Sequence, residues 1–167
     1  MTSSKTVIIM RHARAEALRD ELLDIDRHLT ATGTKQAKKA MRFLDKLELV
    51  PNKIVSSHYV RALQTAEHLV KQARKLDKSS DIELVVEEAL GLAAPMKKFT
   101  DWLTQSFDEL PDVTLIVSHE PNISRYLGYL LSSKTSVYNV KKGSLAIFTL
   151  ESPTNAKLNA FVPPKLM

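Results

Sequence analysis

Residues 6–12, T-V-I-I-M-R-H, determine much of how this chain must fold. Four apolar residues follow one another here without alternation, which is typical of a strand that is buried on both faces of a parallel sheet. An arginine and a histidine come directly after the apolar run. The stretch therefore predicts a central strand with Arg11 and His12, two side chains that can bind anions or take part in catalysis, at its carboxyl end.

The rest of the chain alternates between short apolar runs and helical spacing of apolar residues. Strands are expected at 53–56, 82–86 and 114–118, and helices around 37–47, 62–73, 99–107 and 123–131. We expect Thr30 or Thr32 to cap the first helix, Pro51 to lie beyond its end, and Pro121 to begin the last helix. Each helix thus connects two strands of one sheet.

The C-terminal part differs from this alternation. Residues 144–150 and 158–162 are two β-type runs on either side of a turn that contains proline and asparagine, and they predict a hairpin. The whole pattern predicts a three-layer α/β/α sandwich with a mostly parallel central sheet and a C-terminal antiparallel hairpin. At 167 residues, we expect residues 1–167 to form a single domain.

Composition excludes several classes of protein. The chain has no cysteine, which excludes disulfides and thiolate metal sites. Its only N-terminal apolar run, Val7–Met10, is too short for a secretory signal, and no segment approaches the roughly 20 apolar residues of a membrane span. A soluble cytoplasmic protein without a membrane partner is therefore expected.

The charge of the chain favours anionic partners. Its net charge is +5 and its pI is near 9.4. The lysines are scattered, however, and the aromatic residues, 6% of the chain, do not alternate with them as a nucleic-acid surface requires. We therefore expect no nucleic-acid partner, and most lysines are interpreted as solvated helix faces.

The candidate site consists of residues that come directly or soon after the strands. Arg11 and His12 lie at the end of the first strand, Arg61 comes soon after the second, and His119 comes after the fourth, directly before a helix. Ligand sites in open α/β sheets lie beyond the carboxyl ends of the strands. The three strands therefore predict one cluster of two arginines and two histidines, whereas His28, His58 and His68 have no such position and are interpreted as ordinary surface residues.

An anion fits this cluster better than a metal ion does. Zinc sites use three or four ligands, and the two histidines lack the close helical pairing of zinc proteases. Neighbouring arginines would repel a cation, but their planar guanidinium groups match the oxygens of a phosphate. With only four glycines the chain has no glycine-rich nucleotide loop. We expect a phosphate-binding cage without metal or cofactor.

Four segments of the chain resemble, in order, the signatures of the histidine phosphatase superfamily, which includes phosphoglycerate mutases. They are V-I-I-M-R-H-A at 7–13, R-H-L-T with the glycine at 33, S-S-H-Y-V-R-A-L-Q-T-A at 56–66 and V-S-H-E-P at 117–121. The short chain without lid insertions is most similar to SixA-type phosphohistidine phosphatases. The resemblance implies the phosphoglycerate mutase-like fold for residues 1–167.

The resemblance also implies roles for individual residues. His12 would attack phosphorus and carry the phosphoryl group, while Arg11, Arg61 and a protonated His119 would hold its oxygens. The resemblance further places Arg27 and Ser57 among the substrate-binding residues and Glu88 as a possible proton donor, with Glu120 as a second candidate for the proton donor. No metal ion and no cofactor would be needed.

Two residues depart from the family's pattern. Ala13 stands where glycine is usual, although its backbone carbonyl can still fix the tautomer of the neighbouring histidine. Alanine restricts the local backbone to negative φ, so a small cost is expected. His58 stands where proline is common and is expected to change the rim of the pocket. Neither change removes a reacting group.

The expected substrate is a phosphohistidine-bearing protein domain of a phosphorelay or phosphotransfer system, because a site without a lid should be open to another protein. The alternative is a small-molecule phosphomonoesterase of the same superfamily, acting on a sugar or nucleotide phosphate, with a mutase as a weaker alternative. A non-catalytic phosphate-binding module is disfavoured because His12 and its three neighbours in the cage are all present. The oligomeric state and the physiological partner are left open.

Overall fold

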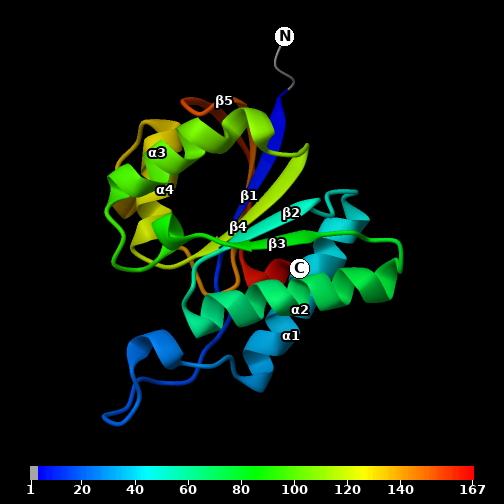
Figure 1. Ribbon diagram of the computed structural model, residues 1–167, viewed down its shortest axis with the longest axis vertical. Coiled ribbons are helices and arrows are strands. Elements are labelled where there is room, and N and C mark those ends of the chain that lie inside the picture. The colour runs from blue at the N-terminus through cyan, green and yellow to red at the C-terminus, as the bar shows by residue number, and fades with distance from the viewer. Residues whose placement is uncertain (1–3) are drawn as a thin grey trace.

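The computed structural model describes residues 4–167, which form one six-stranded sheet with helices on both faces (Figure 1). In chain order the elements are β1 (Lys5–Arg11), α1 (Ala31–Lys46), β2 (Lys53–Ser56), α2 (Val60–Leu76), β3 (Glu83–Val86), α3 (Met96–Ser106), β4 (Val113–Ser118), α4 (Asn122–Leu131), β5 (Leu145–Ser152) and β6 (Asn155–Val162). The strand order across the sheet is β3-β2-β4-β1-β5-β6. The mixed α/β architecture with a mostly parallel sheet is confirmed.

The register of the sheet brings three strand ends to one edge. β1 pairs in parallel with β4 so that Arg11 lies opposite Ser118, and β4 pairs in parallel with β2 so that Val117 lies opposite Ser56. β5 runs antiparallel to β1, and β6 completes the predicted hairpin beside β5. The residues that come after β1, β2 and β4 therefore leave the sheet at the same edge, as parallel strands require.

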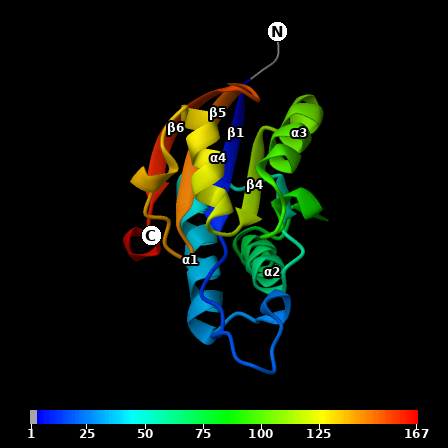
Figure 2. The same cartoon turned by 90° about the vertical axis from the view of Figure 1, so that its left-hand side faces the viewer.

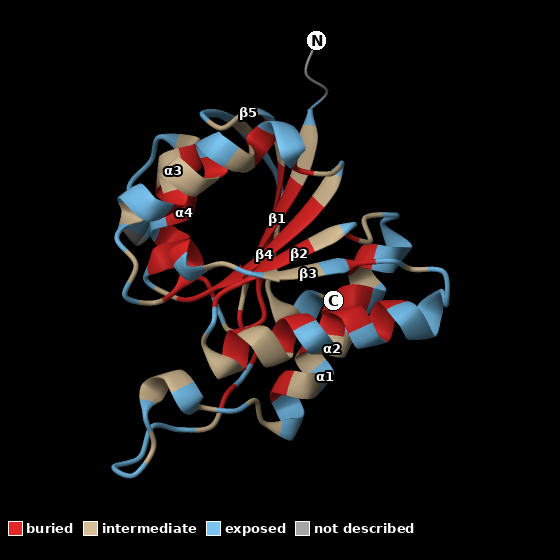
Figure 3. Ribbon diagram, in the orientation of Figure 1, coloured by how far each residue is buried: buried red, intermediate tan, exposed pale blue. Residues whose placement is uncertain are grey.

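Alternate residues of the central strands enter two separate cores. Along β1, Val7 and Ile9 pack with residues of α3 and α4, whereas Ile8 and Met10 pack with residues of α1 and α2. Figures 1 and 2 show these two helix pairs on opposite faces of the sheet, and Figure 3 shows the central strands β1 and β4 as largely buried. Because both faces are covered, β1 is apolar without alternation.

The helix boundaries follow local signals. The Thr30 hydroxyl caps α1 by accepting a hydrogen bond from the Gly33 amide at 3.1 Å, so Thr30 and not Thr32 is the cap. α1 ends at Lys46, and Leu47, which the spacing predicts on its apolar face, lies beyond the helix and is exposed. Pro95 and Pro121 are the residues that immediately precede α3 and α4. Pro121 therefore lies one position before the first helical residue.

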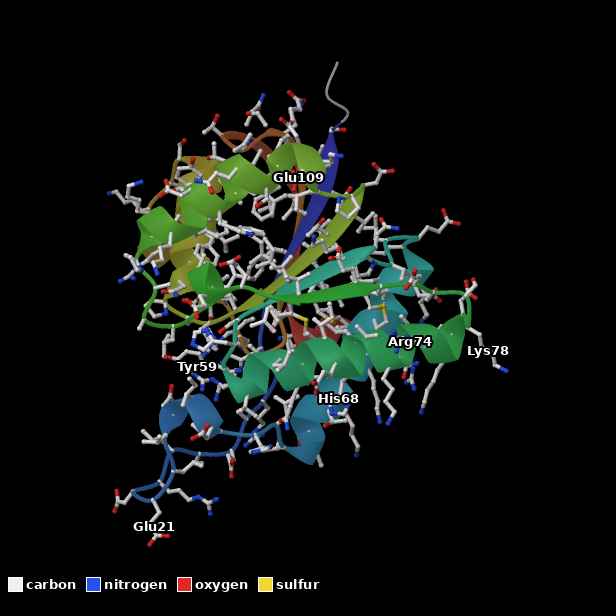
Figure 4. The ribbon with its side chains drawn as sticks, in the orientation of Figure 1. Glu21, Tyr59, His68, Arg74, Lys78 and Glu109 are labelled. Atoms are coloured by element: carbon white, nitrogen blue, oxygen red, sulfur yellow. The ribbon has the colours of Figure 1, made fainter. Side chains whose placement is uncertain are left out.

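A long connection between β1 and α1 projects away from the sheet on the side of the strand ends (Figures 1 and 2). A single bridge between Ala15 and Leu29 ties its two arms together, and Figure 4 shows Glu21 near its tip. One short 3₁₀ helix, η1 (Asp24–Asp26), lies on its returning arm and has no buried residue. This connection, residues 13–30, is called the β1–α1 loop below.

Gly33 is required by the packing of this loop on α1. A Cβ atom at position 33 would lie 2.1 Å from the carbonyl oxygen of Arg14, far inside contact distance. The backbone that leaves β1 therefore crosses α1 at Gly33, where the helix has no side chain to block it. In residues 4–167, no helix is both long and apolar enough to cross a membrane.

Candidate active site

Four side chains from three strand ends meet at the edge of the sheet. The rings of His12 and His119 lie with their centroids 5.2 Å apart, and Arg61 Nε lies 3.3 Å from His12 Nε2. Arg11 precedes His12 and is fixed from the other side, because its Nη1 donates to the carbonyl of Val140 at 2.7 Å. The structure therefore brings together Arg11, His12, Arg61 and His119, as the strand ends predicted.

His12 is buried, and a single contact fixes its tautomer. Its Nδ1 lies 2.8 Å from the carbonyl oxygen of Ala13, so Nδ1 carries the hydrogen and Nε2 keeps its lone pair. The ring is 4% exposed, and the amide of His12 donates to the Ser118 carbonyl at 3.0 Å. Ala13 supplies the carbonyl expected of it and does so without positive φ. Its own amide donates to Thr65 Oγ1 at 3.0 Å.

The surroundings of His12 keep its imidazole neutral. Burial, together with the positive charges of Arg61, Arg11 and Lys142, lowers its pKa to about 3, although the hydrogen bond with the Ala13 carbonyl opposes this. At neutral pH the Nε2 atom is therefore an unprotonated nitrogen among cations. A neutral imidazole can attack an electrophile without a separate base to remove its proton.

His119 is held by Ser57 and lies against Tyr59. Its Nε2 lies 2.8 Å from Ser57 Oγ, and its ring packs edge-on to Tyr59 with the centroids 4.8 Å apart. Burial, together with the neighbouring His12 and Arg61, lowers the pKa of His119 to about 2. Burial and nearby cations therefore favour the neutral ring in the protein by itself, and the protonated His119 expected beside a phosphate stays a prediction. His119 Nδ1 is buried and has no protein partner among the described residues.

Asp24 of the β1–α1 loop holds Arg61. The Asp24 carbonyl oxygen accepts a hydrogen bond from Nη1 at 2.5 Å, and its carboxylate accepts one from Nη2 at 3.0 Å. The guanidinium also lies over the ring of Tyr59, 5.0 Å from its centroid. Figure 4 shows Tyr59 at the N-terminal end of α2, between that helix and η1. Arg61 is 3% exposed, so the loop and the helix together enclose it.

A turn before β5 adds further positive charge. The amide of Gly143 donates to the carbonyls of Arg11 and His12 at 3.1 and 3.2 Å, and Gly143 has the positive φ of 83° that this turn requires. Lys142 precedes it. Burial lowers the pKa of Lys142, and the charges of Arg11, Arg27, Arg14 and Arg61 lower it further. Lys142 therefore belongs to the positively charged surroundings of His12.

The remaining predicted site residues, Arg27, Ser57 and Glu88, make different kinds of contact around the cage. Arg27 donates through Nε to the Glu16 carbonyl and through Nη1 to Asp24, both within the β1–α1 loop. Ser57 contacts His119, so its hydroxyl is tied to the cage. Glu88 is exposed and lines a cavity of about 290 Å³ together with His58, Tyr59 and Lys98.

Glu120, the second candidate for the proton donor, is turned away toward α4. Its carboxylate accepts hydrogen bonds from the amide and the hydroxyl of Ser124 at 3.0 and 2.6 Å. It therefore caps the start of α4. Burial lowers the pKa of Arg11, and the charge of Glu120 partly opposes this lowering. His58 lines the same cavity as Glu88, and its Cε1 atom lies where a Cβ at Gly91 would approach within 2.7 Å.

Three site residues were missed from the sequence. Asp24 and Lys142 lie in polar loops without periodicity, and Tyr59 precedes a helix whose apolar face it does not share. Asp24 stands three residues before Arg27, just ahead of the segment 27–30 that was singled out, and this closeness was a usable signal. No group of three or more His, Asp or Glu side chains within residues 4–167 is arranged to hold a metal ion.

In chemical terms the site presents a neutral nitrogen nucleophile among positively charged side chains. The guanidinium groups of Arg11 and Arg61 and the unpartnered His119 Nδ1 can each donate to an oxyanion. Such preorganised donors stabilise negative charge that develops on a transferring phosphoryl group. The arrangement is suited to binding a tetrahedral oxyanion beside His12 Nε2.

Comparison with known protein families gives a match over half of the chain. The model of the histidine phosphatase superfamily (branch 1) matches residues 7–91, which are 85 of the 167 residues. Over 78 residues the chain is 35% identical to a 2,3-bisphosphoglycerate-dependent phosphoglycerate mutase from Leifsonia xyli subsp. xyli (strain CTCB07). That match covers 46% of this chain and only 31% of the mutase, so the chain spans about a third of this relative.

Solved structures share the fold over nearly the full length. The protein histidine phosphatase SixA complexed with tungstate superposes with a TM-score of 0.80 at 22% identity, covering 96% of this chain and 97% of SixA. A mycobacterial glucosyl-3-phosphoglycerate phosphatase superposes with a TM-score of 0.71 at 15% identity, covering 95% and 98%. At these identities the likeness establishes the phosphoglycerate mutase-like fold.

Proposed function

The chain belongs to the histidine phosphatase superfamily, and we propose that it is a phosphohistidine phosphatase that works through a phosphorylated His12. The observation that carries the proposal is the state of His12. Its Nδ1 is committed to the Ala13 carbonyl, and its unprotonated Nε2 faces the guanidinium of Arg61. Nucleophile and charge-stabilising group are thus adjacent, as phosphoryl transfer requires.

The first step transfers the phosphoryl group to His12. The Nε2 lone pair forms a bond to phosphorus while the bond from phosphorus to the leaving nitrogen of the substrate breaks, and that nitrogen takes up a proton. Arg11 and Arg61 hold the equatorial oxygens, and Lys142 adds positive charge nearby. The His119 Nδ1 is unpartnered and can donate to an oxygen when its other nitrogen accepts from Ser57.

The second step returns His12 to its starting state. A water molecule attacks the phosphorus of phospho-His12, the N–P bond breaks, and inorganic phosphate leaves with the oxygen of the water. The lone pair returns to Nε2, and the Ala13 carbonyl keeps the same tautomer throughout. We propose that the cationic side chains supply the charge stabilisation that a metal ion supplies in other phosphatases, so that no metal is needed.

The substrate class follows from the leaving group. Phosphohistidine carries a labile P–N bond, so its ring nitrogen needs less help from a general acid than an alcohol does. Glu88, the possible proton donor, is exposed on the rim of the neighbouring cavity, and Glu120 is occupied at the start of α4. This arrangement favours a protein-borne phosphohistidine as substrate over a phosphate ester, with phosphate as the bound product.

A small-molecule phosphomonoesterase is the second candidate. Tyr59 lines the cavity of about 290 Å³ and also contacts His119 of the cage. A cavity of this volume can hold a small leaving group but not a protein domain. Glu88 on its rim could then protonate an ester oxygen. The structural likeness to a glucosyl-3-phosphoglycerate phosphatase is compatible with such a substrate.

Turnover measurements separate these candidates. Wild type and His12→Ala are assayed with excess chelator on a histidine-phosphorylated phosphotransfer domain and on a panel of sugar and nucleotide phosphates. We expect release of phosphate from the phosphoprotein to be faster, and His12→Ala to lose it by at least about 1,000-fold, the scale of a lost nucleophile. Mass spectrometry should find an acid-labile phosphoryl group on His12 in wild type after quenching at alkaline pH.

The other outcomes are informative as well. A preference for a small phosphate would retain the mechanism and replace the substrate class. Loss of turnover in chelator would contradict the metal-independent mechanism. Turnover that persists in His12→Ala would contradict the nucleophile, and a failure to hydrolyse any of these compounds would leave a phosphate-binding module as the better interpretation.

A further inference from the structure

We propose that Asp24 is a positioning residue for phosphoryl transfer, because it clamps the Arg61 guanidinium in the orientation that faces His12. The kinetic consequence of this clamp rests on the proposed function, but the clamp itself is a property of the protein. Asp24 reaches Arg61 from the β1–α1 loop, 37 residues earlier in the chain, and it contacts the guanidinium with both its backbone and its side chain.

The contacts with Asp24 leave the edge of the guanidinium that faces His12 unoccupied by the loop. Asp24 binds both terminal nitrogens, Nη1 through its carbonyl oxygen and Nη2 through its carboxylate, while Nε remains directed at His12 Nε2. A guanidinium has five N–H groups, so each terminal nitrogen keeps a second hydrogen that can bind an oxyanion. The clamp and a phosphoryl group can therefore occupy Arg61 at the same time.

Arg61 has a specific need for such a clamp. Arg11 and Lys142 each feel the charge of Arg61, and this repulsion favours a guanidinium turned away from the cage. Its long side chain also has many rotamers, and freezing them in the productive geometry costs conformational entropy during the reaction unless the protein has already done so. Asp24 supplies an opposite charge on the side away from His12 and fixes the plane of the group.

Asp24 is itself held by Arg27. Arg27 Nη1 donates to Asp24 Oδ1 at 2.9 Å, and Arg27 Nε donates to the Glu16 carbonyl at 2.8 Å, across the two arms of the β1–α1 loop. Burial raises the pKa of the Asp24 carboxyl, but the hydrogen bonds from Arg27 and Arg61 outweigh it and hold that pKa below its ordinary value. The carboxylate is therefore charged at neutral pH, and Arg27 acts on the site through Asp24.

The test compares three variants with wild type. Asp24→Ala removes the carboxylate, Asp24→Asn keeps its shape without its charge, and Asp26→Asn is the matched control. Asp26 lies on the same 3₁₀ turn, is exposed and makes no side-chain hydrogen bond or ion pair in the described part of the chain. Steady-state kinetics on the phosphorylated phosphotransfer domain are combined with ¹H–¹⁵N NMR of the arginine Nε–H groups, with Arg61 assigned from Arg61→Lys.

We expect Asp24→Ala to lower kcat by about 100-fold with a smaller change in KM, because misplacing a charge-stabilising group by about 1 Å has effects of that order. The kcat of Asp24→Asn should lie between those of Asp24→Ala and wild type. The kcat of Asp26→Asn should remain within about twofold of wild type, because substitutions of exposed charges usually have small effects. The Arg61 Nε–H signal should be distinct and slowly exchanging in wild type and Asp26→Asn, and should merge with the exposed arginines in Asp24→Ala.

Either of two results would overturn the proposal. One is a kcat of Asp24→Ala equal to that of Asp26→Asn. The other is an Arg61 Nε–H signal that stays unchanged in Asp24→Ala, even if activity falls, because Asp24 then does not orient the guanidinium. If wild type itself hydrolyses nothing, the proposed function fails, and the NMR comparison still decides whether the clamp exists.

Discussion

At the scale of single residues, the site depends on groups that are buried in their uncharged state. His12 and His119 lie among arginines and a lysine, so charging either ring would add a buried cation beside others. The Ala13 carbonyl and the Ser57 hydroxyl satisfy one nitrogen of each ring without supplying a negative charge. The neutral state that suits the nucleophile is thus also the state in which the fold is more stable.

This predicts a loss of stability in mild acid. The pKa values of His12 and His119 are about 3 and about 2 in the folded protein, below the ordinary value of 6.5, so the unfolded chain binds more protons below pH 6.5. Their contribution is complete above pH 6.5 and is lost as the pH falls from there toward 3. Between pH 7 and 5 the free energy of unfolding should fall by about 2 kcal/mol for each histidine.

Urea unfolding at a series of pH values checks this prediction. His119→Gln should remove about half of the decrease between pH 7 and 5, whereas the exposed His28, replaced by Gln, serves as control and should leave the decrease unchanged. If the free energy of unfolding of His119→Gln falls between pH 7 and 5 as steeply as that of wild type, this histidine is not kept neutral by the fold.

At the scale of elements, the β1–α1 loop connects the first strand to the site. It leaves β1 at His12, passes over Gly33 of α1 and returns through η1 to place Asp24 against Arg61. Thr30 ends the loop by accepting from the Gly33 amide and donating to the Arg14 carbonyl at 3.2 Å. The start of α1 and the segment after His12 are therefore one packed unit.

Gly33→Ala should break this unit. The added methyl group would meet the Arg14 carbonyl oxygen at 2.1 Å, so the loop or the helix must move. We expect a loss of about 1–3 kcal/mol in the free energy of unfolding, the usual cost of an added methyl group in a packed site, together with reduced kcat. Thr32→Ala, at an exposed position one residue away, is the control and should have little effect. Equal stability of the two variants would refute the close approach as a structural requirement.

At the scale of the whole molecule, a basic chain surrounds a site for anions. The net charge of +5 raises the local concentration of acidic partners, and Arg11, Arg61 and Lys142 concentrate positive potential at the edge of the sheet. The fold of the sheet and its two helical layers brings these groups together in space, although they are far apart in the sequence. Long-range attraction and local binding therefore act in the same direction.

An acidic phosphoprotein substrate should consequently show salt-dependent turnover. Raising the ionic strength from about 0.02 M to about 0.3 M shortens the Debye length, and kcat/KM for the phosphotransfer domain should fall by about tenfold. For a small phosphate in the same assay we expect a weaker decrease, since it carries fewer charges. Equal salt dependence of the two substrates would argue against electrostatic docking of a protein.

The sequence by itself determined the elements and the cluster at the sheet edge. Apolar runs are local signals, and the two-sided burial of β1 needs nothing more than Val7–Met10 to be expected. The convergence of Arg11, His12, Arg61 and His119 followed from the rule that parallel strands end at one edge, and the register of β1, β2 and β4 bears it out.

Only the tertiary structure decided how those side chains are oriented and which protonation states they have. The β1–α1 loop is polar and without periodicity, so nothing local indicated that Asp24 would reach Arg61. The neutral state of His119 depends on its burial and on charges from other elements. These effects cannot be added up from the sequence of one strand. Periodic burial is encoded residue by residue, whereas electrostatics depends on distances that exist only once the chain has folded.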